Sequence, residues 1–386
     1  YGVDVVVRFN GGCQGGRTVK TPAGESHSFS FFGAGSFAGA ATYLGPHFVA
    51  NPMVFMKEAE FLCSSIRKTI PDVFVNHNVQ ITTPYDILLN QMLEDNRPIS
   101  HRLGSSGIGF GETIHRGDDY PLTFSMVEDS AKLINGLTKI RDEYFPKRCK
   151  ELGLDPAGGQ FIIADTNIFT NFIQDACTMY ECCTLDDGSD VLHDANQILF
   201  EGSGGLLLDP VHGNPPYVSA GNLSIDHALS ILDAIGINSI DPIYVTRVYT
   251  TRQGGGPLAH EVLDAGGRFK TPYPDVTEYD NSRNYYQGSV RYGYLDADAL
   301  KLAINHEMNR VAHRGFDGVT SLAITCLDHL GDHGEAKVFM DGSLKTLRSD
   351  AYGDVADAIN GHVGLSSEPF KSTGPTRLDV SHKNSS

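Results

Sequence analysis

Four glycine-rich loops hold the residue types in this sequence that are best suited to binding phosphate. They occupy residues 10–18, 104–111, 202–205 and 253–257, and each follows an apolar or strand-like run. Backbone N–H groups in such loops can surround phosphate oxygens, and small hydroxyl side chains add further donors. One loop of this kind is more often a tight turn, but four in one chain favour a nucleotide-type ligand.

The hydrophobic pattern predicts the elements that must hold these loops. Asn51 is a candidate N-cap for a first helix that has Pro52 at its first position. Strands followed by glycine-rich loops and alternating with helices predict an α/β fold that binds ligands at the carboxyl ends of its strands. We expect one large domain over residues 1–386, with a frayed polar tail at 379–386. Strands are expected at residues 3–9, 74–81, 197–201, 242–248 and 321–327, and helices at 53–66, 87–95, 131–144, 167–180 and 295–311.

The composition argues against several classes of protein. The 386 residues include 30 Lys and Arg against 47 Asp and Glu, a net charge of −17, whereas nucleic-acid-binding proteins usually carry a basic face. No apolar run is long enough to span a membrane. The seven cysteines lack CxxC spacing, which fits reduced thiols in the cytoplasm. No His or Cys pair has the spacing of a metal site, so we expect no metal-ligating residues.

Several segments, in the same order along the chain, resemble signature segments of the adenylosuccinate synthetase family. Together they cover almost the whole sequence, which makes the resemblance specific. It implies the fold of that family: a single large α/β domain with a central, mostly parallel sheet flanked by helices. The matching segments are residues 7–12, 103–107, 116–117, 200–209, 212–213, 216–219, 249–257, 261, 293–296, 325–328 and 372–375.

The resemblance implies a ligase. Members of this family use GTP and Mg²⁺ to phosphorylate the 6-oxygen of a purine nucleotide, and the amino group of aspartate then displaces that phosphate. A phage branch of the family is similar but accepts dGMP. The implied partners are therefore a purine nucleoside monophosphate, aspartate or another amine, GTP or ATP, and a second copy of the chain in a homodimer.

The matched motifs also imply roles for single residues. Ser106 and Ser219 resemble hydroxyls that hold the phosphate of the acceptor nucleotide, and Arg116 resembles an arginine that reaches this phosphate from the other subunit. Asp328 resembles an aspartate that accepts hydrogen bonds from guanine. The full set is Gln14, Ser105, Ser106, Arg116, Gly204 and Ser219 for the acceptor nucleotide, Gln253 and Arg291 for the amino acid, and Asp328 and Gly374 for the base of the triphosphate.

Each of these residues also has a purely structural interpretation. A serine in a loop before a helix is commonly an N-cap, which would account for Ser106 and Ser219. Arg116 could be a solvated surface charge, and Asp328 could cap the next helix. The sequence leaves these alternatives open.

The chain departs from the family pattern at several positions. Arg17 lies where relatives have a catalytic histidine; an arginine can donate to a 6-phosphoryl group but cannot act as a proton donor near neutral pH. Gly204 replaces a glutamine that reads the purine in relatives, which either leaves room for a 2-amino group or simply loses the contact. Of the arginine-rich loop that binds aspartate, Arg291 remains, with Arg283 nearby. The phosphate-binding loop of relatives has no match, and we expect it to precede Tyr1.

These departures leave two hypotheses. The chain is either an active ligase with Arg17 as its catalytic residue, or a catalytically inactive relative that is kept for nucleotide binding or a structural role. A phage could encode such an inactive relative. Turnover of a purine monophosphate that depends on Ser106 would separate them.

Overall fold

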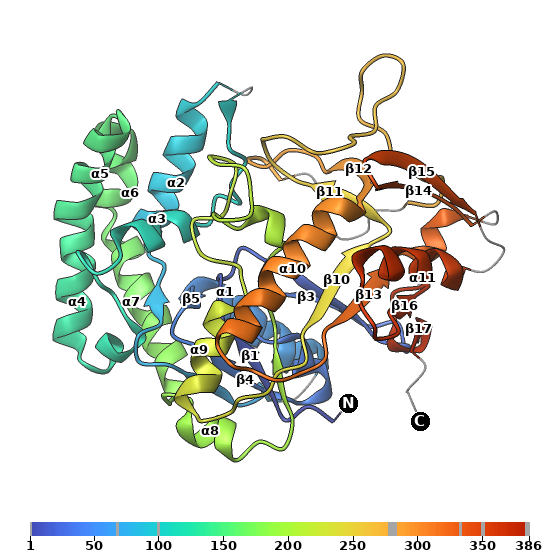
Figure 1. Ribbon diagram of the computed structural model, residues 1–386. Coiled ribbons are helices and arrows are strands. Elements are labelled where there is room, and N and C mark those ends of the chain that lie inside the picture. The colour runs from blue at the N-terminus through green and yellow to red at the C-terminus, as the bar shows by residue number, and fades with distance from the viewer. Residues whose placement is uncertain are drawn as a thin grey trace. The chain divides into compact units, whose positions relative to one another are not determined.

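The structure, a computed structural model, describes residues 2–66, 69–98, 101–276, 284–331, 334–348 and 352–382 (Figure 1). The chain divides into two compact units. Unit 1 comprises Tyr1–Thr18 and Ser28–Ile237, and unit 2 comprises Val19–His27 and Asn238–Ser386. Each unit has its own sheets and helices, and the single-domain organisation stays a prediction.

Unit 1 is built on a five-stranded sheet in which every pairing is parallel. Its strand order is β8-β6-β4-β1-β9, and all four residues of β1 are buried. Central strands of parallel sheets are covered on both faces, which is why β1 is an uninterrupted apolar run ending in a buried arginine. The predicted mostly parallel sheet is confirmed. The strands are β1 (Val5–Arg8), β4 (Ala41–Leu44), β6 (Val73–Val75), β8 (Thr184–Leu185) and β9 (Ile198–Phe200).

The helices of unit 1 follow the predicted pattern closely. The Asn51 side chain accepts hydrogen bonds from the N–H groups of Met53 and Val54, so the predicted N-cap of α1 is confirmed. In Figure 1 the green helices α4 to α7 lie together as one group. The helices are α1 (Pro52–Phe61), α2 (Pro84–Asn96), α3 (Phe110–Arg116), α4 (Ser130–Lys139), α5 (Phe145–Leu152), α6 (Gln160–Ala164), α7 (Thr166–Glu181), α8 (Ser189–His193) and α9 (Asp226–Ala234); η1 (Ala34–Ala38), η2 (Leu62–Ile66), η4 (Phe124–Glu128), η5 (Ile140–Tyr144), η6 (Pro156–Gly159) and η7 (Leu206–Leu208) are shorter turns.

Unit 2 contains two four-stranded sheets. One has the order β10-β13-β16-β17 and the other β11-β12-β14-β15. The buried faces of these strands pack with the helices α10 and α11 in one hydrophobic core. The elements are β10 (Ile243–Arg247), β11 (Tyr249–Arg252), β12 (Arg291–Asp296), α10 (Ala297–His313), β13 (Ser321–Thr325), η8 (Leu327–Leu330), β14 (Glu335–Met340), β15 (Ser343–Arg348), α11 (Tyr352–Val363), β16 (Phe370–Ser372), η9 (Arg377–Asp379) and β17 (Val380–Ser381).

Three expectations need correction. The single strand expected at 74–81 is two strands, β6 and β7 (Gln80–Ile81), because the Asn76 side chain accepts from the Asn78 N–H and turns the chain between them. The expected helix at 295–311 starts later, since β12 runs to Asp296, whose carboxylate caps α10. The tail is not frayed at Val380 and Ser381, because β17 pairs with β16.

Three further small elements complete the described part of the chain. β2 (Arg17–Lys20) and β3 (Ser26–Phe29) pair with each other, and β5 (Val49–Ala50) pairs with β7. None of the helices in the described ranges is both long and apolar enough to cross a bilayer.

Candidate functional site

Two glycine-rich loops of unit 1 meet because they follow neighbouring parallel strands, β1 and β9. The Ser203 N–H donates to Asn10 Oδ1 over 3.0 Å. A Cβ atom at Gly11, where φ is +67°, would lie 2.2 Å from Ser203 Oγ, and one at Gly15 would lie 2.8 Å from the Ser203 carbonyl oxygen. Glycine is therefore required for the first loop to close around Ser203.

Arg17, the predicted catalytic residue, lies against these loops. Its Nη1 donates to the Gly15 carbonyl over 2.8 Å and its Nη2 to the Gly202 carbonyl over 2.7 Å. Its Nε is 3.5 Å from Glu201 Oε2, and 12% of the side chain is exposed. Burial, followed by the neighbouring Arg8 charge, lowers the pKa of Arg17 to about 10. Arg17 therefore remains a cation at neutral pH, where it can donate hydrogen bonds.

A second arginine, Arg8, lies fully buried beside it. Arg8 Nη1 donates to the carbonyls of Phe31 and Phe32, and its guanidinium is 4.9 Å from the Phe48 ring centre. The same chain segment donates the N–H groups of residues 30–32 to the Glu58 carboxylate. Burial lowers the pKa of Arg8 and raises the pKa of Glu58. This network places a fixed positive charge beneath the loops.

Several buried polar atoms of this cluster have no hydrogen-bond partner in the described part of the chain. They are Arg8 Nε and Nη2, Asn10 Nδ2, Gln14 Oε1, Arg17 Nε and Ser203 Oγ. Leaving such a group unpaired costs about 1–3 kcal/mol, so unpaired buried groups that cluster indicate a ligand site. Most of these groups are donors, which suits the oxygens of an anion. The sequence predicted Gln14 here but missed Arg8, Asn10 and Ser203, although all three lie within segments that matched the family.

Ser105 and Ser106 lie in a loop that is held by the side chains of α2. Asn90 Nδ2 donates to Ser105 Oγ over 2.7 Å, and Asn90 Oδ1 accepts from the Gly109 N–H over 3.1 Å. The Ser106 hydroxyl makes no hydrogen bond within the described ranges. The N-cap of α3 is Gly109, which has no side-chain cap bond, so Ser106 is not a helix cap.

Ser219 and Gly204 lie in the segment that follows β9. Ser219 Oγ accepts from the Gly221 N–H, and the N-cap of α9 is Ile225, so Ser219 is not a helix cap either. The buried Asp209 carboxylate accepts the Leu223 N–H over 2.6 Å and thereby fixes this segment. A Cβ atom at Gly204 would be 3.2 Å from Leu223 Cδ1, a contact that a small side-chain shift would relieve.

Arg116 points into the interior of unit 1. Its Nε is 3.1 Å from the buried Asp86 carboxylate, its Nη1 donates to the Tyr120 carbonyl over 2.7 Å, and its Nη2 donates to the Ile81 carbonyl. The alternative that Arg116 is a solvated surface charge is therefore wrong. Its participation in phosphate binding stays a prediction.

Gln253 and Arg291 in unit 2 fasten a loop between two strands. β11 and β12 are antiparallel, with Arg252 opposite Arg291. Gln253 Nε2 donates to the Gly288 carbonyl, and Arg291 Nη2 donates to the Gly256 carbonyl over 2.6 Å. Arg291 Nη1 is also 3.4 Å from Glu261 Oε1, so its charge is already paired. Arg283 lies outside the described residues.

Asp328 and Gly374 follow neighbouring parallel strands, β13 and β16. The Asp328 side chain is 38% exposed and lies inside η8, whose cap position is Cys326, so Asp328 does not cap that turn. A Cβ atom at Gly374 would be 2.6 Å from Asp379 Cγ, which makes glycine necessary there. The two residues therefore lie at the carboxyl ends of adjacent strands, the usual position of a ligand in an open α/β sheet.

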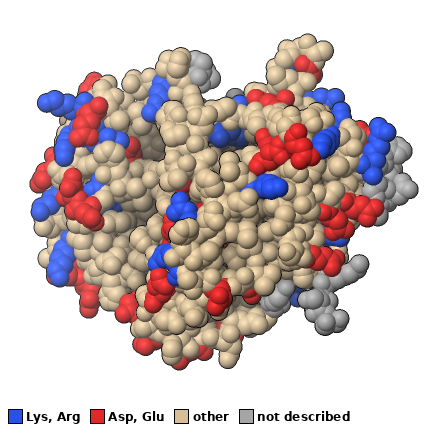
Figure 2. Space-filling model, viewed as in Figure 1, with Lys and Arg blue, Asp and Glu red and all other residues tan. Residues whose placement is uncertain are grey.

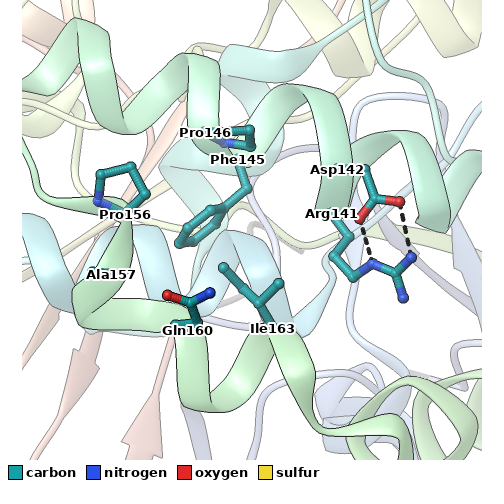
Figure 3. Close-up of a pocket in the computed structure, with 8 residues that line it drawn as sticks. All are labelled: Arg141, Asp142, Phe145, Pro146, Pro156, Ala157, Gln160 and Ile163. Carbon is teal, nitrogen blue, oxygen red and sulfur yellow. Dashed lines mark hydrogen bonds and ion pairs between the residues drawn. The ribbon is translucent and has the colours of Figure 1, made fainter.

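A separate cavity of about 280 Å³ lies among η5, α5, η6 and α6 of unit 1 (Figure 3). Its charged residues, Arg141 and Asp142, form a two-bonded ion pair with each other over 2.6 and 2.8 Å. Phe145 and Ile163 supply apolar lining. None of the predicted site residues lines this cavity, and its charges are already paired, so it is a poor phosphate site.

The described residues contain no group of three or more His, Cys, Asp and Glu side chains that could hold a metal ion.

On the face shown in Figure 2, acidic and basic side chains are interspersed. A protein that follows a nucleic-acid backbone usually presents a continuous basic surface instead.

Comparisons with known proteins agree with the sequence motifs. A sequence profile of adenylosuccinate synthetase matches residues 2–346. The adenylosuccinate synthetase of Methanococcoides burtonii is 26% identical over 353 residues, covering 90% of this chain and 78% of that protein. The Mesoplasma florum enzyme is 28% identical over 343 residues, covering 85% of this chain and 71% of that protein.

Two solved structures resemble this fold. The fully ligated adenylosuccinate synthetase of Plasmodium falciparum has a TM-score of 0.71 at 16% identity, covering 99% of this chain and 94% of that chain. The succinoaminodeoxyadenylate synthetase of cyanophage S-2L, bound to dGMP and to dATP as an energy donor, has a TM-score of 0.58 at 16% identity, covering 98% of this chain and 87% of that chain.

Proposed function

Because the chain belongs to the adenylosuccinate synthetase family and is a ligase of that type, we propose that it joins an amino acid to position 6 of a purine nucleotide through a 6-phosphoryl intermediate. The observation that carries the proposal is the cluster of unpaired buried donors around Arg17 in unit 1. A phosphoryl group would satisfy these donors, and they are held in place before it arrives.

Arg17 is proposed to stabilise negative charge on the 6-phosphoryl group. Two of its nitrogens are anchored to backbone carbonyls, so the guanidinium does not have to reorganise during the reaction. With a pKa of about 10 it keeps its proton at neutral pH, and any proton transfer has to involve another group. This separates the electrostatic part of the chemistry from the acid–base part.

The acceptor is proposed to be a purine nucleoside monophosphate. The unpaired Ser106 hydroxyl, together with Ser105, Ser219 and Gln14, would bind its phosphate and sugar. Gly204 is proposed to admit a 2-amino group on the purine because it has no side chain; a Cβ atom there would lie 3.2 Å from Leu223 Cδ1. The phage protein of similar fold was solved with dGMP, a purine that carries such a group.

Asp328 and Gly374 are proposed to bind the base of the triphosphate donor. A carboxylate accepts two hydrogen bonds from the N1–H and 2-amino groups of guanine, whereas adenine offers one donor and one acceptor on the same edge. The half-buried Asp328 carboxylate, which lies 3.8 Å from His329 Nε2, therefore favours GTP over ATP. Mg²⁺ would enter with the triphosphate and be held by its phosphates. The described residues contain no cluster of three ligands for it, so no step is assigned to the metal.

The second substrate is proposed to be aspartate or another amine, bound near Gln253 and Arg291 of unit 2. A substrate carboxylate would have to compete with Glu261 for the Arg291 guanidinium.

We also propose that the protein is a cytoplasmic homodimer. Light scattering of the purified protein would test the dimer.

The decisive experiment follows nucleotide-dependent phosphate release by the full-length protein with Mg²⁺, GTP or ATP, aspartate and a panel of purine monophosphates, with product identification by mass spectrometry. We expect turnover with GTP, and Ser106→Ala to raise the KM for the monophosphate about tenfold, because a hydrogen bond to a charged phosphate is lost. Ser230→Ala, on the exposed surface of α9, is the matched control. Nucleotide binding without turnover would favour the inactive relative instead.

Gly204→Gln tests the purine specificity separately. A glutamine side chain would fill the space beside the purine at the cost of a small shift of Leu223. We expect it to lower kcat/KM for 2-amino purine nucleotides more than for IMP. An equal loss for both would show that Gly204 does not select the purine.

A further inference from the structure

One carboxylate, that of Glu201, lies between the two arginines of unit 1. Its Oε2 atom is 3.5 Å from Arg17 Nε and 3.8 Å from Arg8 Nε, and it accepts the Ala34 N–H over 3.3 Å. The side chain is 15% exposed. Glu201 directly follows β9, so its backbone is fixed by the sheet.

Two of these three contacts are immobile. Arg8 has no exposed surface and is held by the carbonyls of Phe31 and Phe32. The Ala34 N–H belongs to the backbone of η1. Glu201 is therefore anchored on one side, and its remaining interaction is directed at the Nε edge of Arg17.

The contact with Glu201 affects the direction of the N–H donors of Arg17. A guanidinium has five N–H donors in one plane. One donor on Nη1 goes to Gly15 and one on Nη2 goes to Gly202, while Nε makes no hydrogen bond and lies 3.5 Å from Glu201 Oε2 in an ion pair. One N–H on each Nη has no acceptor among the described residues. Because the group is planar, fixing its Nε edge also fixes the direction of these two donors.

We infer that Glu201 is a positioning residue for Arg17: its carboxylate holds the Nε edge of the guanidinium so that the two uncommitted N–H groups stay directed at the phosphoryl group. The inference rests on the proposed function, and deepens it by naming the residue that orients the phosphoryl-binding arginine. Glu201 itself does not touch substrate.

The charge of Glu201 supports the same role as its position beside Arg17. The groups that face Arg17 are Arg8 on β1, Cys13 in the first loop, Glu58 on α1 and Glu201. Burial raises the pKa of Cys13 to about 12, so this thiol is neutral in the working range. Glu201 opposes the effects of burial and of Arg8 on the pKa of Arg17. Removing its charge should lower that pKa further below about 10, and the alkaline loss of kcat should then begin at lower pH.

The test compares Glu201→Gln with Glu60→Gln in the full-length protein. Both remove a carboxylate from unit 1, but Glu60 is exposed on α1 and is not one of the groups that face Arg17. We expect Glu201→Gln to lower kcat at least tenfold, to change the KM values less than threefold, and to shift the alkaline limb of kcat downward, because a misdirected donor costs transition-state stabilisation. Glu60→Gln should keep the wild-type kcat and alkaline limb.

The outcomes separate the two proposals. Wild-type protein without turnover overturns the proposed function. Wild-type turnover together with an unchanged kcat in folded Glu201→Gln, or an identical pH shift in Glu60→Gln, overturns the positioning role and leaves the function standing. If Glu201→Gln does not fold, Glu201→Asp replaces it, because it keeps the charge on a shorter side chain. It should lose kcat with a wild-type alkaline limb, and a full wild-type kcat would overturn the inference.

Discussion

The loops around Arg17 in unit 1 and the loops around Arg291 in unit 2 look alike in sequence, but the structure uses their arginines differently. In unit 1 Arg17 keeps two uncommitted N–H groups within the described residues, and Asn10, Gln14 and Ser203 nearby have unpaired buried atoms. In unit 2 Arg291 donates to the Gly256 carbonyl and forms an ion pair with Glu261; its buried Nε lacks a hydrogen bond, as does that of Arg17, but the other unpaired buried atom beside it is a Glu261 oxygen, which is an acceptor.

An arginine next to a glycine-rich loop therefore has two uses. It can fasten the loop by donating to its carbonyls, or it can hold donors ready for an anion. The number of buried donors left unpaired distinguishes the two uses, because each of them loses free energy until a ligand arrives. By this measure unit 1 holds the stronger anion site, and unit 2 has to release a contact before it binds a carboxylate.

The largest expected effect comes from removing the donors in unit 1. Arg17→Ala should lower kcat about 100- to 1,000-fold, the range seen when a donor to developing charge is lost. Arg17→His should recover part of the activity and add a pH dependence near the ordinary pKa of histidine. Steady-state kinetics between pH 5 and 10 measures both. An alanine variant with wild-type kcat would show that the Arg17 donors of unit 1 do not act in catalysis.

A smaller effect is expected at the base-binding residue of unit 2. Asp328→Asn replaces one acceptor by a donor, so it should raise the KM for GTP about 10- to 100-fold while the KM for the monophosphate stays near its wild-type value. Initial rates at varied GTP and monophosphate concentrations measure both constants. Equal effects on both substrates would indicate a folding defect rather than lost base recognition.

The Arg291–Glu261 pair allows a direct test of the second use of an arginine. If aspartate binds Arg291, Arg291→Gln should raise its KM about tenfold. Glu261→Gln should lower that KM about threefold, because the guanidinium no longer has a competing carboxylate. The double variant should resemble Arg291→Gln alone. A Glu261→Gln variant with weaker aspartate binding would show that the glutamate itself contacts the amine.

The smallest expected effect concerns the pH dependence of the folding stability of unit 1, which is distinct from the pH dependence of its site. The His47 and His227 rings stack with their centres 3.7 Å apart, and burial, followed by the His47 charge, lowers the pKa of His227 from 6.5 to about 4. The unfolded chain therefore binds a proton more readily, so stability falls as the pH drops from 6.5 towards 4. After allowance for solvent screening the loss is on the order of 1 kcal/mol.

His227→Phe keeps a ring in this stack but removes the titration. Urea unfolding at pH 7 and pH 4.5 should show a smaller acid loss for this variant than for the wild type. His193→Phe, at an exposed histidine, is the control and should behave like the wild type. An unchanged acid loss in His227→Phe would assign the effect to other groups.

The features that the sequence predicts best depend on local patterns of residues. The Asn51–Pro52 start of α1, the buried β1 strand and the loops that follow β1 and β9 all depend on residues close together in the chain. The single strand expected at 74–81 was wrong because one side-chain hydrogen bond, from Asn78 N–H to Asn76, turns the chain inside this segment. The Ser106 and Ser219 caps, offered as alternatives, do not exist in this fold.

By itself the sequence determined the fold class, the family and the positions of the glycine-rich loops, because signature order and hydrophobic periodicity are local properties of the chain. Only the tertiary structure decided which donors are left unpaired. Arg17 contacts the Gly202 carbonyl 185 residues away, and Arg116, which was expected at a phosphate, turns inward to Asp86. Such pairings depend on strand order and register, which bring distant residues together, and no local spacing encodes them.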